Sequence, residues 1–528
     1  MRFLLVLCSL CLSLLAGAAH GRDGALLAAL AGGDSGTKLE ALNAIAASGD
    51  SRWIPLLEAL RAGEVRADET GRLYIAREGA VFDALQGVAV EPPPDELSSV
   101  TVNNRLRRAI GTAIAALQLR ASDRETRLKA AQSLDRKDTS LLPVVERALA
   151  QEKDAQIREL LELVHAGMQL ENEDPAVRLA AVKALGQSDD PGTRALLLVR
   201  LDPGVESDEA VRAQAKASLR EVEARLARGE YLGHIFSGVS LGSILLLAAL
   251  GLAITYGLMG VINMAHGELI MIGAYATYVV QNLFQSLLPG LFDWYLLAAL
   301  PVAFAASALV GMAMERSVIR FLYGRPLETL LATWGISLVL IQLVRTIFGA
   351  QNVTVSHPVW MSGGTQVMSN LVLPYNRVVI IGFAAAVLLA VWLILTRTRL
   401  GLFVRGVTQN RAMAGCVGVP TARVDTYAFA LGSGIAGLAG CALSQIGNVG
   451  PDLGQAYIVD SFMVVVLGGV GQLAGTVYAA LGLGVVNKFL EAWQGAVLAK
   501  IAVLVFIIAF IQKRPQGLFA LKGRFADA

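Results

Sequence analysis

One short segment of this chain places residues that could exchange protons or bind a polar solute inside an apolar stretch. The segment GLMGVINMAHGELIMIGAY, residues 257–275, holds Asn263, His266 and Glu268 among four glycines. An amide, an imidazole and a carboxylate together offer hydrogen-bond donors and acceptors. A charged side chain at the centre of a bilayer costs roughly 2.5 kcal/mol or more on insertion scales. These side chains therefore need polar partners or a path that excludes lipid.

The spacing of these residues predicts a break in the helix that carries them. On one unbroken helix Asn263 and His266 share a face, whereas Glu268 points about 200° away from His266. A break at His266–Gly267 would allow all three to turn inward. Two interpretations stay open: the side chains cap broken helix ends, or they contact a solute on a path through the bundle.

A change in composition near residue 230 divides the chain into two parts, and the second part contains the elements that must position this segment. The chain has 528 residues, of which 55% are hydrophobic. Charged residues recur before position 230, and runs of about 20 apolar residues, long enough to span a bilayer, dominate after it. The sequence predicts an all-α protein with a soluble domain at 20–229 and a membrane domain at 230–528. The net charge of +2, without a basic aromatic surface, gives no indication of nucleic acid.

The N-terminus has the features of an export signal. Residues 1–19 combine a basic start, an apolar stretch and small residues at Ala16 and Ala18, which predicts a cleaved signal peptide. The alternative is an uncleaved anchor helix, and both place residues 20–229 outside the cytoplasm. That domain holds no cysteine, so its own apolar core must stabilise it.

The exported half contains a repeated pattern. An aspartate followed four positions later by Arg or Lys, with apolar residues at helical spacing, predicts N-capped helices that stack like HEAT repeats. The copies begin at Asp34, Asp123, Asp174 and Asp208, with a degenerate copy at Asp154. An insertion near 61–100 contains EVRADETGRLYIAREG, which alternates around a Thr-Gly turn and predicts a small hairpin.

The membrane half predicts roughly eight spans plus re-entrant or broken segments. Arginine-rich loops alternate with loops that lack Lys and Arg, so the positive-inside rule places residue 230 in the periplasm and the C-terminus in the cytoplasm. The expected spans are about 232–256, 264–283, 294–315, 328–349, 376–396, 425–446 and 495–512, with an interrupted stretch at 458–490.

The interrupted stretch has the same glycine-rich character as the opening segment. Gly468, Gly469 and Gly471 fall where a continuous helix would be weakened, and orientation requires that this stretch begin and end on the same side. Glycine-interrupted segments in both halves of a transporter typically mark broken helices at the midplane. We therefore assign these glycines to the predicted translocation path.

Five motifs carry a family resemblance: residues 257–275, TWGISLVLIQ from Thr333, GLFVRGVTQNRAMAGCVGV from Gly401, VVLGGVGQLAG from Val465 and KRPQGLF from Lys513. Together they resemble the membrane permeases of ATP-binding-cassette (ABC) importers for branched-chain amino acids and urea. The resemblance implies that the third motif is the cytoplasmic loop that couples to an ATPase. An ordinary loop held by lipid headgroups is the alternative. The coupling residues implied are Gly401, Arg405, Asn410, Ala414 and Gly418.

The exported extension makes the chain most similar to the urea-type permease, so urea is the substrate we expect. Asn263, Gln342 and Gln445 could line a path for it, although Gln445 could equally mark the end of a helix. The resemblance implies a paralogous permease, two ABC ATPases, a periplasmic solute-binding protein and contact with lipid as partners, in the bacterial inner membrane. A branched-chain amino acid permease of the same family and a stand-alone facilitative channel are the alternatives.

The sequence gives no indication of catalysis by this chain. It contains no Gly-x-x-x-x-Gly-Lys-Ser/Thr phosphate loop, so ATP hydrolysis would fall to partner subunits. His266 and Glu268 are near neighbours, but no His-Glu-x-x-His motif accompanies them. We therefore expect no catalytic residue, no metal site and no cofactor.

Overall fold

The computed structural model describes residues 23–519 except 33, 69, 78–79, 86, 91, 93, 95–96 and 137. The predicted signal peptide, residues 1–19, lies outside the described residues. The chain forms two compact units, one ending at Leu226 and the other starting at Ala227.

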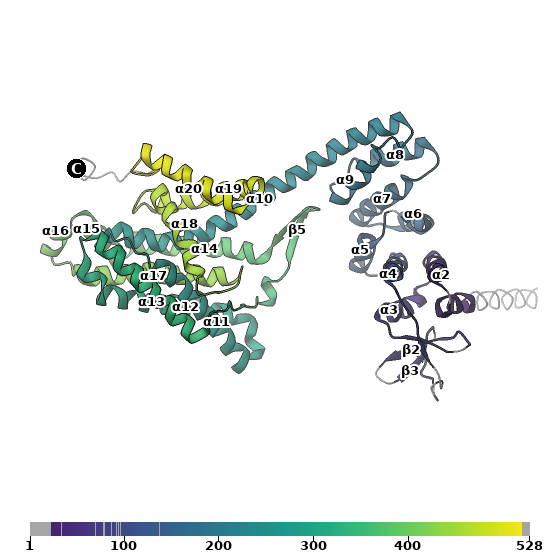
Figure 1. Ribbon diagram of the computed structural model, residues 1–528, viewed down its shortest axis with the longest axis horizontal. Coiled ribbons are helices and arrows are strands. Elements are labelled where there is room, and N and C mark those ends of the chain that lie inside the picture. Colours follow the sequence, from purple (N-terminus) through teal and green to yellow (C-terminus); the bar gives the residue numbers. More distant parts are fainter. Residues whose placement is uncertain are drawn as a thin grey trace, which may run out of the picture. The chain divides into compact units, whose positions relative to one another are not determined.

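The first unit consists mainly of successive helices (Figure 1). Residues 23–32 are helical, and an apolar core connects the helices up to α7 while a second core connects α7 to α10. The helices are α2 (Ser35–Ser48), α3 (Ile54–Ala62), α4 (Asn104–Gln118), α5 (Arg124–Ser133), α6 (Leu142–Gln151), α7 (Ala155–Gln169), α8 (Pro175–Leu185), α9 (Pro191–Val199) and the start of α10 (Glu209–Met259).

Each repeated aspartate begins a helix. Asp34 accepts a hydrogen bond from the Thr37 amide at 2.8 Å, and Asp123 accepts one from the Thr126 amide at 2.8 Å. The aspartates before α7, α8 and α10 cap in the same way. Because the first amides of a helix have no partner within it, these carboxylates fix where each helix starts.

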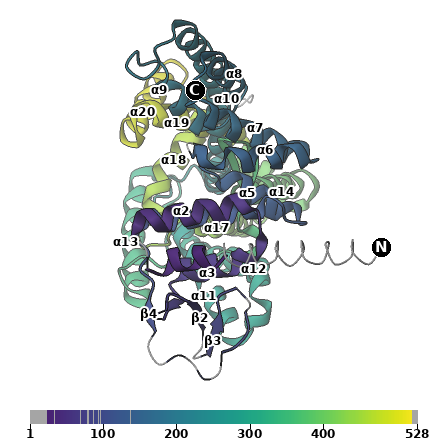
Figure 2. The same ribbon diagram turned by 90° about the vertical axis from the view of Figure 1, so that its right-hand side faces the viewer.

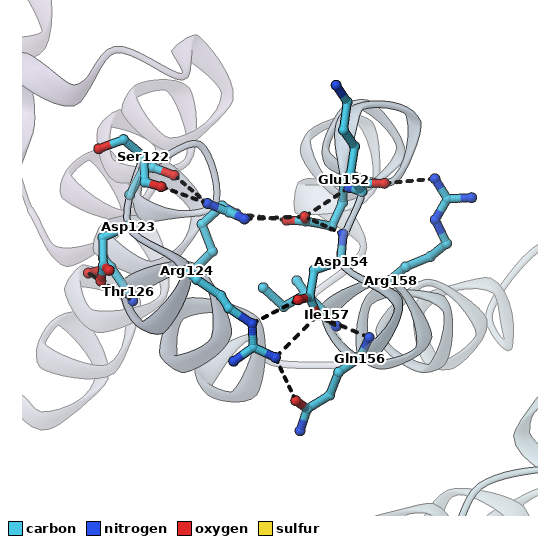
Figure 3. Close-up of polar contacts among 12 residues, drawn as sticks. Ser122, Asp123, Arg124, Thr126, Glu152, Asp154, Gln156, Ile157 and Arg158 are labelled. Carbon is cyan, nitrogen blue, oxygen red and sulfur yellow. Dashed lines mark hydrogen bonds and ion pairs between the residues drawn. The ribbon is translucent and has the colours of Figure 1, made fainter.

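In two copies of the pattern, the arginine four residues after the aspartate joins its helix to the helix two further along, and Figure 3 shows the surroundings of Ser122 and Glu152 at one of these junctions. Arg127 of α5 donates to the carbonyls of Ala121 and Ser122, both at 3.0 Å, and its Nε donates to Glu152 at 2.9 Å. Glu152 lies just before α7, where it also accepts from the Asp154 amide at 3.0 Å. Arg127 therefore connects the start of α5 to the start of α7.

The junction between α8 and α10 has the same construction. Arg178 donates to the carbonyls of Asn172 and Glu173 and forms two hydrogen bonds, of 2.7 and 2.8 Å, with Glu206. Glu206 in turn accepts from the Asp208 amide at 3.1 Å. In both junctions the arginine thus reaches a carboxylate that lies two helices further along the chain.

The insertion is larger than the predicted hairpin. It forms an antiparallel sheet of order β3-β2-β1-β4, which Figure 2 shows beside α3. The Thr-Gly turn does join the first two strands, with Gly71 at φ +79° and Asp68 accepting from the Thr70 and Arg72 amides. The all-α prediction therefore needs correction here, because β3 and β4 add to the hairpin edges. The strands are β1 (Val65–Ala67), β2 (Leu73–Arg77), β3 (Ala80–Asp83) and β4 (Ser98–Ser99).

The second unit is a helical bundle in which α11, α12 and α17 pack closely against one another. A two-stranded ribbon of β5 (Gly364–Met368) and β6 (Leu371–Pro374) precedes α14. The helices after α10 are α11 (His266–Leu287), α12 (Tyr295–Ser317), α13 (Pro326–Phe348), α14 (Tyr375–Arg397), α15 (Arg399–Gln409), α16 (Arg411–Cys416), α17 (Thr421–Ser444), α18 (Leu453–Gly468), α19 (Leu473–Gln494) and α20 (Ala496–Lys513).

Among the described residues, seven helical segments are long and apolar enough to cross a membrane. The prediction of roughly eight spans differs from this for two reasons. The helix α11 carries His266, Glu268 and Gln281, which lower its hydropathy, and α18 has only 16 residues. The predicted interruption of 458–490 is present, because residues 469–472 separate α18 from α19.

Candidate functional site

The helix break in the opening segment lies between α10 and α11. Gly260 adopts φ +64°, and the chain stays non-helical until His266. Asn263 stabilises the turn, since its Oδ1 accepts from the Ala265 amide at 3.1 Å. Thr333 of α13 accepts from the Met264 amide at 3.2 Å. The predicted break at His266–Gly267 is therefore wrong by a few residues: α11 begins at His266, directly after this turn.

The three polar side chains of the segment are buried and point to different neighbours. His266 donates from Nε2 to the Ala248 carbonyl of α10 at 3.0 Å. Glu268 accepts at Oε1 from Ser337 Oγ of α13 at 2.5 Å. The exposed fractions of Asn263, His266 and Glu268 are 0%, 0% and 1%. The segment thus connects α10 to α13 through buried polar contacts.

Each of the three residues also keeps one buried polar atom without a partner among the described residues. These atoms are Asn263 Nδ2, His266 Nδ1 and Glu268 Oε2. Since His266 donates from Nε2, a neutral ring leaves Nδ1 as an acceptor. A buried polar atom without a hydrogen bond is costly, so these atoms are sites where water or a polar solute would be stabilised.

The two glycine-rich segments predicted as broken contact each other. A Cβ added to Gly257, near the end of α10, would lie 2.6 Å from the Cα of Gly471, between α18 and α19. A Cβ on Gly267 would likewise lie 2.6 Å from the Gly454 carbonyl of α18. Glycine is required at these positions because backbone meets backbone.

The C-terminal motif KRPQGLF packs on the second break. The Leu518 amide donates to the Leu467 carbonyl at 2.8 Å, and the Phe519 amide donates to the Gly468 carbonyl at 3.3 Å. Gly469, with φ +99°, approaches this C-terminal segment so closely that a Cβ would lie 2.4 Å from the Phe519 carbonyl. The C-terminal segment therefore fixes the conformation of the turn after α18.

The two glutamines predicted for the path lie away from this region. Gln342 is exposed on α13, five residues after Ser337, and no hydrogen bond joins it to the polar segment among the described residues. Gln445 is buried at the end of α17, where its Nε2 donates to the Tyr295 hydroxyl at 3.1 Å. Asn376 Nδ2 donates to the Gln445 carbonyl at 3.3 Å. Gln445 thus caps a helix end, which was the alternative interpretation of this residue.

The predicted coupling residues lie on two short helices, α15 and α16. Asn410 caps α16 by accepting from the Met413 amide at 2.9 Å, and Gly418 adopts φ +88° after it. A Cβ on Gly401 would lie 2.0 Å from the Leu395 carbonyl of α14. Arg405 donates to the same carbonyl at 3.0 Å, so it fixes α15 to α14.

The structure adds residues that sequence reasoning missed. Arg411 of α16 forms an ion pair with Asp425 of α17, and its guanidinium lies over the ring of Tyr323. Ser337 and Thr333 of α13 bond the polar segment. The motif TWGISLVLIQ contained both, but nothing in its spacing identified their partners. Among the described residues, no group of His, Cys, Asp and Glu could hold a metal ion.

Comparison with known proteins assigns the class. The seven described helical segments that are long and apolar enough to cross a membrane, in a bundle with broken glycine-rich helices, define a multi-pass membrane protein. Residues 234–511 match the family described as branched-chain amino acid transport system / permease component, and the chain belongs to this family.

Two branched-chain amino acid permeases align with this chain over most of their own length. The high-affinity branched-chain amino acid transport system permease protein LivH of Salmonella typhimurium is 28% identical over 299 residues, covering 54% of this chain and 95% of LivH. BraD of Pseudomonas aeruginosa, a permease of the same kind, is 27% identical over 294 residues with the same coverage. The ribose import permease protein RbsC of Escherichia coli is 31% identical over 112 residues, 20% of this chain and 35% of RbsC. No solved structure matches the chain.

Proposed function

We propose that this chain is the membrane-spanning subunit of an ABC importer for urea in the bacterial inner membrane. The observation that supports urea is the chemistry of the buried polar segment. Its atoms without partners comprise one donor, Asn263 Nδ2, and two acceptors, His266 Nδ1 and Glu268 Oε2. Urea is neutral and offers a carbonyl acceptor and two amino donors, so it needs hydrogen-bonding groups of both kinds and no counter-ion.

The charges around the segment agree with a neutral solute. Among the described residues, no Lys or Arg bonds Asn263, His266 or Glu268. A branched-chain amino acid would bring an ammonium group, which Glu268 could pair, together with a carboxylate, for which no Lys or Arg among the described residues of this segment offers a partner. The buried site therefore favours a neutral polar molecule.

A branched-chain amino acid is the second candidate, favoured by the relatives. LivH and BraD carry that substrate in their names and align with this chain over 95% of their length. These alignments cover only 54% of this chain. The unit before residue 227 is the feature that resembles the urea-type permease.

We assign α15 and α16 to the contact with ABC ATPases. The two helices enclose a groove of about 340 Å³. Leu402, Met413 and Val417 line it with exposed fractions of 60%, 60% and 71%. Exposed apolar side chains on a short basic loop suit a protein contact better than water. A stand-alone facilitative channel would need no such surface. We further propose a second, paralogous permease and a periplasmic solute-binding protein as partners.

The orientation proposed for the chain follows from its loop charges. The arginine-rich segment 397–423 and the C-terminus would face the cytoplasm, and the first unit would lie in the periplasm as a HEAT-like repeat domain. The capping aspartates and the two arginine–glutamate junctions of that unit support the repeat assignment.

Uptake of labelled urea and labelled leucine, in cells with and without the gene, tests the substrate. External solute is kept low, because passive entry of urea would otherwise mask transport. We expect urea uptake alone to fall when the gene is deleted. A fall in leucine uptake alone would overturn urea in favour of the second candidate.

Replacing Arg405 by Glu in the intact importer tests the coupling assignment, which would be wrong if ATP-dependent uptake were unchanged.

A further inference from the structure

The first unit contains a cleft whose charges the transport function does not use. The cleft has a volume of about 440 Å³ and is lined by α3, α4 and the segment after α5. Arg61 enters it from the last turn of α3, and Arg107 and Arg108 enter it from α4. Its lining includes a single carboxylate residue, Asp135, so guanidinium groups predominate.

These arginines differ from the arginines that form ion pairs within the same unit. Arg124, Arg127 and Arg178 each bond a carboxylate, as do several further arginines of this unit. Among the described residues, by contrast, none accepts a hydrogen bond from the guanidinium of Arg61 or Arg107. Arg108 reaches only the Asn104 carbonyl of its own helix, at 3.5 Å. The cleft therefore holds guanidinium groups whose bonding capacity the folded unit leaves largely unused.

The position of two of these arginines is unfavourable for the helix itself. Arg107 and Arg108, together with Arg105, lie near the N-terminus of α4, and no acidic residue lies in its first turn. The positive end of a helix dipole repels cations, and folding alone favours Asp or Glu there. The stability of the helix therefore gives no reason for arginines at this end, and a ligand with negative charge would offset their repulsion.

The shape of the cleft selects the kind of ligand. Gly111 lies within it, and a Cβ there would meet nothing within 4 Å, so the floor is open backbone. Arg61 and Arg107 come from different helices and can hold separate anionic groups. Each guanidinium can bind one carboxylate with two parallel hydrogen bonds. A recessed site of this kind suits a protruding segment better than a flat membrane surface.

We propose that this cleft is a docking site for an acidic segment of a partner protein, one that presents several Asp or Glu side chains in succession. The carboxylates bind Arg61, Arg107 and Arg108, and the segment enters between α3 and α4. This site is separate from the translocation path and from the α15–α16 surface, and it does not depend on which solute is carried.

Peptide binding to the full-length protein in nanodiscs of phosphatidylcholine tests this proposal. The probe is a fluorescent peptide that alternates Glu and Gly, and the matched peptide replaces each Glu by Gln. We expect only the acidic peptide to bind, with a Kd that rises with added salt because exposed charges are screened. The triple variant R61Q/R107Q/R108Q should raise the Kd by about tenfold or more.

A control variant separates this cleft from general surface charge. Lys183, Lys216 and Arg220 are exposed residues of the same unit outside the cleft, and K183Q/K216Q/R220Q removes the same charge. We expect this variant to bind the acidic peptide like the natural chain. Equal weakening in both triple variants, or no binding to the natural chain, would overturn the proposal. So would binding of phosphatidylglycerol vesicles without binding of the peptide, which would indicate a membrane surface.

Charge reversal gives a result that misfolding could not produce. The variant R61E/R107E/R108E should lose the acidic peptide and gain binding of a peptide that alternates Lys and Gly. A variant that binds neither peptide, while its thermal unfolding matches that of the natural chain, would contradict the assignment of this cleft.

Discussion

The guanidinium carbon of Arg411 lies 4.8 Å from the centre of the Tyr323 ring. Arg411 at the same time forms an ion pair with Asp425, which is fully buried in α17. The Tyr323 hydroxyl donates to Met259 Sδ at 2.7 Å, and Met259 is the last residue of α10 before the break at Gly260. A continuous set of contacts therefore runs from α16 to the broken segment. We expect a displacement of α16 to reach that segment through Tyr323.

The double variant R411M/D425N tests this connection. Removing Arg411 alone would leave a buried carboxylate without its cation, a change that typically costs roughly 3–5 kcal/mol, so the double variant avoids that charge. In proteoliposomes that contain the assembled importer, we expect ATP hydrolysis to continue while uptake per ATP falls. The control is R423Q, since Arg423 is exposed in the same region. Equal uptake per ATP in the double variant and the control would exclude this route.

Replacing Ser337 by Ala tests the buried polar segment. Ser337 donates the one described hydrogen bond to Glu268, whose other oxygen has no described partner. Loss of a partner for a buried group costs roughly 1–3 kcal/mol, and more for a charged one. We expect a lower melting temperature in detergent and reduced uptake. The variant E268Q retains an acceptor for Ser337, so it should melt close to the natural chain. If S337A melted like E268Q, the hydrogen bond would contribute nothing to stability.

The sequence predicted the general architecture because its signals were local. Runs of apolar residues located the membrane helices, glycines located both helix breaks, and the aspartates at Asp34, Asp123 and Asp174 located helix starts. These features depend on a few neighbouring residues. The position of the first break was a few residues wrong, because Asn263 bonds the Ala265 amide and lets α11 begin at His266.

Contacts between distant residues could not be predicted in this way. Glu268 meets Ser337 and Arg411 meets Tyr323 only because α11, α13 and α16 are brought together by the fold. The sheet β3-β2-β1-β4 was predicted only as a hairpin. Its strand β4 has two residues, Ser98 and Ser99, which is too short for an alternating pattern to reveal it. The predicted path residue Gln342 lies on an exposed face, which helical periodicity within α13 alone could not settle.

Replacing Gly267 by Ala tests the close approach of α11 and α18. The added Cβ would lie 2.6 Å from the Gly454 carbonyl, and backbone cannot move aside as a flexible side chain can. We expect a loss of stability of roughly 1–3 kcal/mol or more from overpacking. Gly382 of α14 provides the control, because a Cβ there meets nothing within 4 Å. G382A should leave the melting temperature unchanged or raise it slightly, and equal effects of the two variants would contradict the predicted crowding.

The junction between Arg178 and Glu206 should make the first unit sensitive to acid. Hydrogen bonds from Arg178 hold the pKa of Glu206 below its usual value, so the folded state favours the carboxylate. The resulting stabilisation is fully present above the unfolded pKa of about 4.5 and is lost as the pH falls through the lower folded pKa. Hydrogen exchange of residues 174–222 in the full-length protein, corrected for intrinsic rates, should therefore show less protection at about pH 3 than at about pH 6.

The variant E206Q should remove most of this dependence on pH. It should also lower protection at about pH 6, because a buried pair that loses one partner is typically destabilised by roughly 3–5 kcal/mol. Glu223 pairs with Arg194 at the surface, where the two side chains are 43% and 57% exposed. E223Q should therefore change protection little, since exposed pairs contribute about 0–1 kcal/mol. If E206Q retained the acid dependence of the natural chain, another carboxylate of the unit would have to cause it.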